Sequence, residues 1–298
     1  MADHQTDGSA LARVRSSLLA WYAADHRDFP WRRTTDPYAV LVSEVMLQQT
    51  RASRVAERFP IFMNRFPTAA AVAAASEADV LAAWSGLGYN RRALALRRAA
   101  AFVADGWPRD VAALEQLPGI GPYTARAVAS LAFGEPVGVV DTNVRRWLVR
   151  RFGLAPDARG RDLQTLADGL AAAGDGADAG PWTHATMEFG AAICTSRNPL
   201  CGACPIAEGC PSRGTASAVP VPRQATFAGS DRALRGALLR ALAEARGKAV
   251  TTRAARQILP ESAFDRIVAA LERDGLLHRA SGSLRLGGRP DTAATIGP

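Results

Sequence analysis

All four cysteines of this 298-residue chain lie in one short stretch, CTSRNPLCGACPIAEGC. They are Cys194, Cys201, Cys204 and Cys210, with the spacing C-x6-C-x2-C-x5-C. Scattered buried thiols would not all fall in one loop, and two disulfides are not expected in a cytosolic chain. Structural zinc usually takes two closely spaced pairs, whereas four thiolates on one loop can also hold a 4Fe–4S cluster. The spacing therefore predicts a metal site and leaves zinc and cluster as alternatives.

The composition indicates a globular chain. Hydrophobic residues make up 48% of it, and no apolar run reaches the length of about 18–20 residues that a membrane span needs. The start, MADHQTDGSA, has neither the cationic nor the apolar region of a signal peptide. We therefore expect a cytoplasmic protein without a membrane partner.

The charge balance indicates a polyanionic partner. The formal net charge is +8, which favours nucleic acid, although a solvated basic surface would give the same number. Lys248 is the only lysine among the 36 lysine and arginine residues. The chain therefore offers almost no amine nucleophile.

Helical periodicity dominates the first 217 or so residues, for example in TAAAVAAASEADVLAAW and RRALALRRAAAFVA. Asp36-Pro37 predicts a helix N-cap followed by proline at the first helical position. A stretch rich in Pro, Ala and Ser predicts a linker over residues 218–229. Three helical segments and a hairpin with a Ser-Gly-Ser turn follow, which predicts a small winged-helix-like unit over 230–290.

Three motifs together resemble the endonuclease III superfamily of DNA glycosylases. The cysteine spacing resembles the iron–sulfur loop of that superfamily, LPGIGPYTA (117–125) resembles its helix-hairpin-helix, and VVDTNVRR (139–146) resembles the segment that carries its catalytic aspartate. Residues 29–50 and 84–96 further resemble adenine DNA glycosylases of the MutY type. The resemblance covers roughly residues 10–212 and implies one 4Fe–4S cluster on the four cysteines.

The same resemblance implies an all-α, two-lobed helix-hairpin-helix core over residues 1–217. One lobe is a six-helix barrel, about residues 30–137. The other lobe carries the cluster and joins residues 1–29 to residues 138–212. The implied partner is double-stranded DNA containing a mismatched adenine, bound by a monomer, and in a bacterium the location is the nucleoid.

The helix-hairpin-helix is expected to bind DNA with backbone groups. Gly119 and Gly121, after Leu117, permit unusual φ values and a close approach of another backbone. Pro122 can start the next helix without losing a needed donor, and the free N–H groups there can face a phosphate. An ordinary turn between helices is the alternative.

Tyr123 decides between two classes of glycosylase. Members of the superfamily that also cut the DNA backbone carry a lysine at this position, and that lysine forms a Schiff base with the sugar. Tyrosine cannot do this, and Lys248 lies beyond the predicted linker. The sequence therefore predicts a monofunctional glycosylase.

Two carboxyl groups are candidates for the chemistry, because cleaving an N-glycosidic bond needs an acid for the base and a negative charge for the sugar cation. Glu44 lies in the apolar helix VLVSEVML, where desolvation would raise its pKa. By resemblance Glu44 protonates adenine N7, and Asp141 stabilises the cation or traps it covalently. Without the resemblance, a satisfied buried glutamate at Glu44 and a plain helix N-cap at Asp141 would be the better interpretations, because neither carboxylate alone is specific.

Further roles follow from the resemblance alone. Arg32 matches an arginine that contacts the flipped adenine, and Gln49 matches a glutamine inserted where the base leaves the stack. Asn143, like Tyr123, matches a polar group near the scissile sugar. Tyr89 lies in WSGLGYNRRALAL, the segment that resembles a DNA-contacting loop.

Two features depart from the family. Asn90 stands where many MutY-type enzymes have a second tyrosine, which intercalates beside the damaged guanine. Only about 70 residues follow the linker, and they are mostly helical, whereas those enzymes often end in a β-rich Nudix-like domain. The recognition of the base opposite adenine is therefore not assigned to any residue.

The leading function is removal of adenine mispaired with 8-oxoguanine or guanine. A mismatch glycosylase for thymine or uracil is the first alternative, against which Glu44 counts because thymine has no N7 to protonate. A non-catalytic iron–sulfur DNA-binding protein or redox sensor is the second alternative. Loss of either carboxylate would favour it, but both are present.

Overall fold

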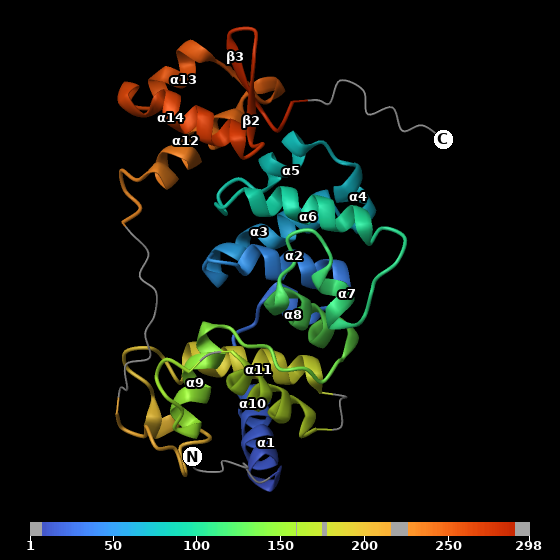
Figure 1. The fold of residues 1–298 in the computed structure, drawn as a ribbon, viewed down its shortest axis with the longest axis vertical. Helices are drawn as coiled ribbons and strands as arrows, with labels where there is room; N and C mark the ends of the chain where they lie inside the picture. The colour runs from blue at the N-terminus through green and yellow to red at the C-terminus, as the bar shows by residue number, and fades with distance from the viewer. Residues whose placement is uncertain (1–7, 159, 175–177, 216–225, 290–298) are drawn as a thin grey trace. The chain divides into compact units, whose positions relative to one another are not determined.

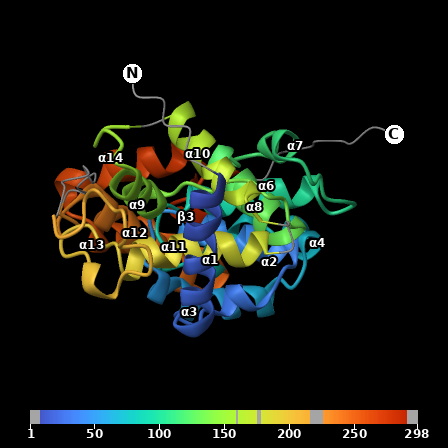
Figure 2. The same cartoon turned by 90° about the horizontal axis from the view of Figure 1, so that it is seen from below.

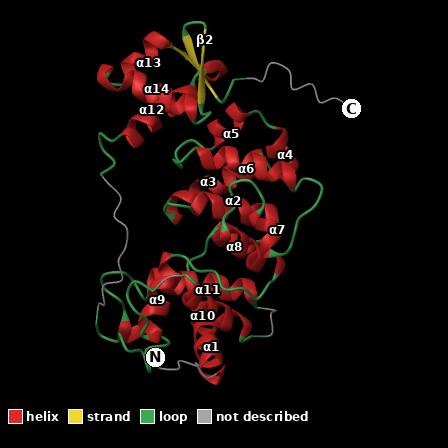
Figure 3. Cartoon of the chain, in the orientation of Figure 1, coloured by secondary structure: helices red, strands yellow, loops and turns green. Residues whose placement is uncertain are grey.

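The structure is a computed structural model that describes residues 8–158, 160–174, 178–215 and 226–289. Nearly all regular structure in these residues is helical, and strands occur only in the C-terminal part, as Figure 3 shows. The predicted all-α core is confirmed, and most of the predicted linker, residues 218–225, lies outside the described residues. By contacts the chain divides into unit 1, residues 1–44 with 108–223, and unit 2, residues 45–107 with 224–298. The lobe predicted over residues 30–137 contributes to both units.

Unit 1 is built around one central helix. Its helices are α1 (Gly8–Ala24), η1 (Pro30–Arg33), α2 (Pro37–Leu47, as far as Glu44), α7 (Val111–Glu115), α8 (Pro122–Phe133), α9 (Thr142–Phe152), α10 (Arg161–Ala172), α11 (Ala179–Ala192) and η2 (Cys201–Ala203). Helix α11 contacts α1, α8, α9 and α10, and Figures 1 and 2 both show α1 beside it. Trp147 and Phe189 meet edge to face at 5.8 Å in the core between α9 and α11.

Short polar residues and glycines set the ends of the helices that carry the candidate residues. Asp36 accepts hydrogen bonds from the backbone N–H groups of Tyr38 and Ala39, so the predicted cap of α2 is confirmed. Gly134 (φ +72°) ends α8, and Gly153 (φ +65°) ends α9, both in the left-handed conformation. The ends of α2, α8 and α9 thus fix where Glu44, Tyr123 and Asp141 stand.

Unit 2 combines a helical part with the C-terminal winged-helix-like unit. Its elements are α3 (Ala52–Arg65), α4 (Ala69–Ala74), α5 (Glu77–Ala83), α6 (Arg91–Phe102), α12 (Asp231–Glu244), η3 (Arg246–Lys248), β1 (Ala249–Thr251), α13 (Thr252–Ile258), α14 (Glu261–Arg273), β2 (Leu277–Ala280) and β3 (Ser283–Leu286). The three predicted C-terminal helices and the hairpin are present, with the turn at Ser281 and Gly282, both at positive φ.

The C-terminal sheet has a third strand that the sequence did not indicate. Strand β1 pairs antiparallel with β3, so that the strand order is β1-β3-β2. Its three residues are too few for an alternating pattern to stand out. None of the described helices is both long and apolar enough to cross a membrane.

Candidate functional site

Glu44 is a buried carboxyl group on α2. The helix is apolar on nearly all sides, and only 3% of Glu44 is exposed. The pKa of Glu44 is raised to about 7, chiefly by burial; a hydrogen bond from Tyr123 opposes the rise, and the charge of the nearby Asp141 adds to it. Within the described residues, Glu44 Oε2 is buried and has no hydrogen-bond partner. Glu44 can therefore hold a proton near neutral pH and has one oxygen available for a ligand.

Tyr123 stands in the first turn of α8 and faces the two carboxyl groups. Its hydroxyl hydrogen-bonds to Glu44 and lies 4.0 Å from Met187 Sδ. Burial, and then the charges of Glu44 and Asp141, raise the pKa of Tyr123 well above its ordinary value. Tyr123 is thus a neutral hydrogen-bond donor in this site.

Asp141 is the N-cap of α9, and its second oxygen is also bound. Asp141 Oδ1 accepts from the backbone N–H groups of Asn143 (2.8 Å) and Val144 (2.6 Å). Asp141 Oδ2 accepts from Asn143 Nδ2 at 2.8 Å. Burial raises the pKa of Asp141, and these donors oppose the rise. Asp141 is therefore both the N-cap of α9 and a neighbour of Glu44.

Asn143 is held by a chain of contacts that runs to the cysteine loop. Arg146 donates to Asn143 Oδ1 at 3.0 Å and to the Cys194 carbonyl at 2.8 Å. Gly190 on α11 packs so closely that an added Cβ would lie 2.7 Å from the Asn143 carbonyl oxygen. The sequence analysis missed Arg146 and Gly190, because neither residue stands out before the helices are packed.

Arg32 belongs to a charged cluster with Arg27 and Glu188, of which the sequence indicated only Arg32. Its guanidinium donates to Glu188 at 2.7 Å and to the Arg27 carbonyl at 2.7 Å. Arg27 also donates to Glu188, at 2.6 Å and 2.9 Å. Burial raises the pKa of Glu188, but these two arginines bring it below the ordinary value. Glu188 could have been found from the sequence by the same signal as Glu44, because it is the lone acidic residue in the apolar helix WTHATMEFGAA.

The helix-hairpin-helix joins α7 to α8 with one glycine at positive φ. Gly119 has φ +78°, as predicted. The same prediction is wrong for Gly121, whose φ of −98° is ordinary extended backbone. A Cβ on Gly121 would meet no atom within 4 Å, so this glycine leaves open space in front of the α8 N-terminus. The Leu117 side chain is buried, which leaves its backbone for any contact with a ligand.

Gln49 and Tyr89 lie in unit 2, and each is a residue other than glycine with a positive φ. Gln49 follows α2 with φ +54°, and Tyr89 precedes α6 with φ +46°. Residues other than glycine rarely adopt this conformation, and where it persists the surroundings enforce it. Here Arg92 enforces it, because it donates to the carbonyls of Gln48 (2.6 Å) and Gly88 (3.0 Å).

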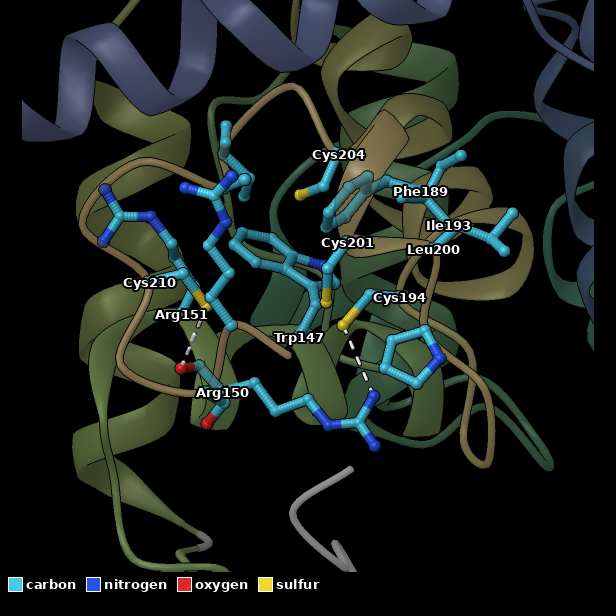
Figure 4. A pocket seen from close by; sticks show the side chains of 15 residues that line it. Trp147, Arg150, Arg151, Phe189, Ile193, Cys194, Leu200, Cys201, Cys204 and Cys210 are labelled. Atoms are coloured by element: carbon cyan, nitrogen blue, oxygen red, sulfur yellow. Dashed lines mark hydrogen bonds between the residues drawn. The ribbon is translucent and has the colours of Figure 1, made fainter. Parts of the chain in front are cut away.

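The four cysteines surround one cavity in unit 1. Figure 4 shows their side chains around Trp147 and Phe189, with Arg150 and Arg151 beside them. All four are free thiols. Burial raises the pKa of the Cys194 thiol, although Arg150 donates to its Sγ at 3.5 Å.

The donor set fits a cluster better than a single ion. Zinc would draw four sulfurs to about 2.3 Å from one point. Four thiols spread around an apolar cavity fit a larger inorganic group instead, with the neighbouring arginines to offset its negative charge.

Two family models match the chain. Residues 42–170 match the HhH-GPD superfamily of base excision DNA repair proteins. Residues 194–210 match the iron–sulfur binding domain of endonuclease III. The chain therefore has one site for a 4Fe–4S cluster, which its four cysteines fit, and the alternative of zinc is set aside.

Curated relatives agree with the family models. The adenine DNA glycosylase of Mycolicibacterium smegmatis is 42% identical over 92% of this chain and 96% of its own length. That of Mycobacterium tuberculosis H37Rv is 45% identical over 75% of this chain and 76% of its own length. The human adenine DNA glycosylase is 41% identical over 70% of this chain and 40% of its own length.

Solved structures share the fold. A thermostable thymine-DNA glycosylase has a TM-score of 0.62 and 30% identity, and the match covers 69% of this chain and 98% of that one. Endonuclease III trapped on DNA has a TM-score of 0.56 and 24% identity, covering 67% and 95% of the two chains. The second likeness supports the fold alone.

Proposed function

Because this chain belongs to the adenine DNA glycosylase family, we propose that it hydrolyses the N-glycosidic bond of adenine mispaired with 8-oxoguanine or guanine in duplex DNA. The observation that carries the proposal is Glu44. It is a buried carboxyl group with a pKa of about 7, and one of its oxygens has no partner among the described residues.

Glu44 is the acid in this mechanism. Adenine leaves poorly as an anion, so protonation at N7 lowers the barrier to cleavage. With a pKa of about 7, a large fraction of Glu44 is protonated at neutral pH. Tyr123 holds one oxygen of the carboxyl group and leaves Oε2 for the base.

Asp141 is the negative charge that faces the sugar cation. Donors favour the ionised form of a carboxyl group. Asp141 has three such donors, two from Asn143 and one from Val144, whereas Glu44 has one, from Tyr123. This difference supports Glu44 as the acid and Asp141 as the carboxylate, which stabilises the cation or traps it covalently.

The strand is left intact by the enzyme. A Schiff-base lyase needs an amine at the sugar, and the chain has one lysine, Lys248. Its Nζ pairs with Asp79 at 3.0 Å in unit 2. The product is therefore an abasic site that breaks only on treatment with alkali or heat.

Cys194, Cys201, Cys204 and Cys210 would hold the cluster, which would crosslink the loop 194–210. Arg146 links that loop to Asn143, so the loop helps to fix the residue that orients Asp141. Purified protein is expected to be brown, with iron and without stoichiometric zinc when prepared anaerobically.

The thymine mismatch reading has one supporting observation, the structural likeness to a thymine-DNA glycosylase at 30% identity. The adenine enzymes are more similar in sequence, at 42–45%. An acid placed to protonate a purine N7 has no counterpart in thymine excision, so Glu44 favours adenine.

The test is excision from three duplexes, with A opposite 8-oxoguanine, A opposite G and T opposite G, followed by alkali. We expect cleavage after alkali for the two adenine duplexes only, and no protein–DNA adduct when borohydride is present. Excision of thymine but not adenine, or an adduct through an amine, would contradict the proposal.

The protein acts as a monomer on DNA, bound largely through arginine–phosphate contacts, and we place it in the cytoplasm at the nucleoid. Such contacts release counterions, so affinity for duplex DNA should fall steeply as salt rises. Binding that does not depend on salt would count against this mode of contact.

A further inference from the structure

The loop Gly86–Asn90 holds an exposed tyrosine in a strained conformation. Gly86 and Gly88 have φ of +91° and +72°, and Tyr89 has φ +46° although it is not glycine. Arg92 donates to the carbonyls of Leu87 (3.4 Å) and Gly88 (3.0 Å), and Trp84 Nε1 donates to Gly88 at 3.2 Å. Tyr89 is still 38% exposed. The loop therefore presents a fixed aromatic ring to solvent.

The winged-helix-like unit is anchored beside this loop within unit 2. Helix α12 packs on α5. Lys248 pairs with Asp79 at 3.0 Å, and the backbone N–H of Gly288 donates to Glu77 at 2.9 Å. These contacts dock the C-terminal unit on the helix that leads into the loop.

A second set of contacts ties α12 to the start of α6. Asp274 accepts from Arg235 of α12 and lies 3.7 Å from Arg91 of α6. The Arg91 side chain is 75% exposed. This end of α6 therefore combines a fixed docking contact with an outward-facing cation.

The docked unit reaches Tyr89 itself. Arg232 Nη1, on the first turn of α12, donates to the Tyr89 hydroxyl at 3.2 Å. The Arg232 guanidinium also lies over the Phe227 ring at 5.3 Å, and Phe227 is 57% exposed. Two exposed aromatic rings joined by a guanidinium form a surface suited to nucleic acid, because rings stack on bases and guanidinium groups bind phosphate.

We propose that the C-terminal unit completes a duplex-DNA contact at the Tyr89 loop, with Arg232 as the residue that positions Tyr89. This inference rests on the proposed function, in which the loop meets DNA. Arg232 fixes the ring through its hydroxyl, so the ring enters the duplex already oriented. The appended unit thereby contributes to affinity for the mismatched duplex and takes no part in bond cleavage.

The test is a double-mutant cycle on binding. The variants are Arg232→Ala, Tyr89→Phe and both together, each in a Glu44→Gln background so that binding is read without excision. Anisotropy with a labelled duplex carrying A opposite 8-oxoguanine gives Kd. The control is Arg240→Ala, which removes an exposed arginine from the same helix.

Each single variant is expected to raise Kd about fivefold, the size of one net hydrogen bond. The double variant should be no weaker than the singles, because both changes remove one interaction. Arg240→Ala should change Kd by less than about twofold, the range of an ordinary surface substitution. Arg232→Lys, which keeps a donor, should recover most of the affinity.

Excision distinguishes this inference from the function on which it rests. With Glu44 intact, Arg232→Ala should slow adenine excision about fivefold when enzyme is limiting, in proportion to its Kd, whereas Arg240→Ala should excise at the wild-type rate. Multiplicative losses in the double variant, an equal loss in Arg240→Ala, or unchanged Kd would overturn the inference. If wild type excises no adenine but the Kd values remain coupled, the proposed function fails and the contact stands.

Discussion

Glu44, buried in unit 1, and Arg92, half-buried in unit 2, are ionisable side chains on helices, and burial favours the neutral form of both. The pKa of Glu44 rises to about 7 and that of Arg92 falls to about 10. Their partners differ. Glu44 has an oxygen with no hydrogen bond among the described residues, whereas Arg92 donates to six backbone carbonyls and to Thr50.

The difference in hydrogen-bond partners distinguishes a group that can take part in a reaction from a group that holds the backbone in place. A buried group with an oxygen that lacks a hydrogen-bond partner can exchange a proton with a ligand. Burying that oxygen unpaired lowers the stability of the folded state. A buried group whose donors are all used instead fixes backbone, here the two turns that present Gln49 and Tyr89. The predictions below test each side of this contrast.

The largest effect is expected from Glu44→Gln. The amide keeps the size of the side chain but cannot donate a proton comparably, so adenine excision should fall about 10²–10⁴-fold while mismatch binding is kept. A single-turnover assay with a parallel binding titration measures both. Glu57→Gln, at an exposed position on α3, is the control. A Glu44→Gln variant that cuts at the wild-type rate would remove Glu44 from the mechanism.

The pH profile of excision should reflect the same proton. The acid is active when protonated, so above a pKa of about 7 the single-turnover rate should fall with rising pH. The slope should approach about tenfold per pH unit, since each unit removes nine-tenths of the protonated form. A rate that rises steadily from pH 7 to pH 9 would mean that Glu44 acts as a base in the slow step.

The Glu44→Gln variant should lose excision but gain stability. The folded pKa of Glu44, about 7, lies above the unfolded value of 4.5, so the folded state binds this proton more tightly. The resulting stability is present below pH 4.5 and is lost as pH rises through 7. Above pH 7 the variant should therefore exceed wild type by about 3 kcal/mol of unfolding free energy, and by much less at pH 5. Urea unfolding at both pH values measures this, and a gain that is equal at the two would exclude the ionisation as its cause.

Arg92→Ala tests the other side of the contrast. It leaves carbonyls of two turns without their donor, so we expect a loss of about 2 kcal/mol in stability and weaker DNA binding. The excision rate at saturating enzyme should change little, because Arg92 touches no reacting group. Arg91→Ala, one residue away and exposed, is the matched control for stability. Equal stability losses in the two variants would show that the hydrogen bonds from Arg92 to the two turns do not stabilise the fold.

The sequence could predict Glu44 and the cysteine site because each signal is local. A lone carboxyl group in VLVSEVML must be desolvated if that helix is buried, and four thiols within one loop must lie close together. The capping role of Asp36 is local for the same reason. Such features need only a helix or a loop to form.

The features that the sequence missed depend on packing. The pair of Arg32 and Glu188 joins residues 156 positions apart, so no spacing rule connects them. Arg92 stands among the arginines of NRRALALRR, and only the assembled unit decides which of them turns inward. The docking of the C-terminal unit through Lys248 and Asp79 is likewise a long-range pairing.

The smallest effect concerns the hairpin, where two glycines that look equivalent in LPGIGPYTA differ in backbone. Gly119 has φ +78°, which an L-residue adopts only at a cost, so Gly119→Ala should destabilise the protein by about 1–2 kcal/mol. Gly121 has φ −98° and open space around its Cα, so Gly121→Ala should change stability by less than about 0.5 kcal/mol. Thermal unfolding separates the two. Duplex affinity should fall in both variants, because the added methyl of Gly121→Ala occupies the space where a phosphate would approach the α8 N-terminus. If Gly121→Ala keeps full affinity, the open space there is not the phosphate site, and the hairpin must meet DNA through another part of the turn.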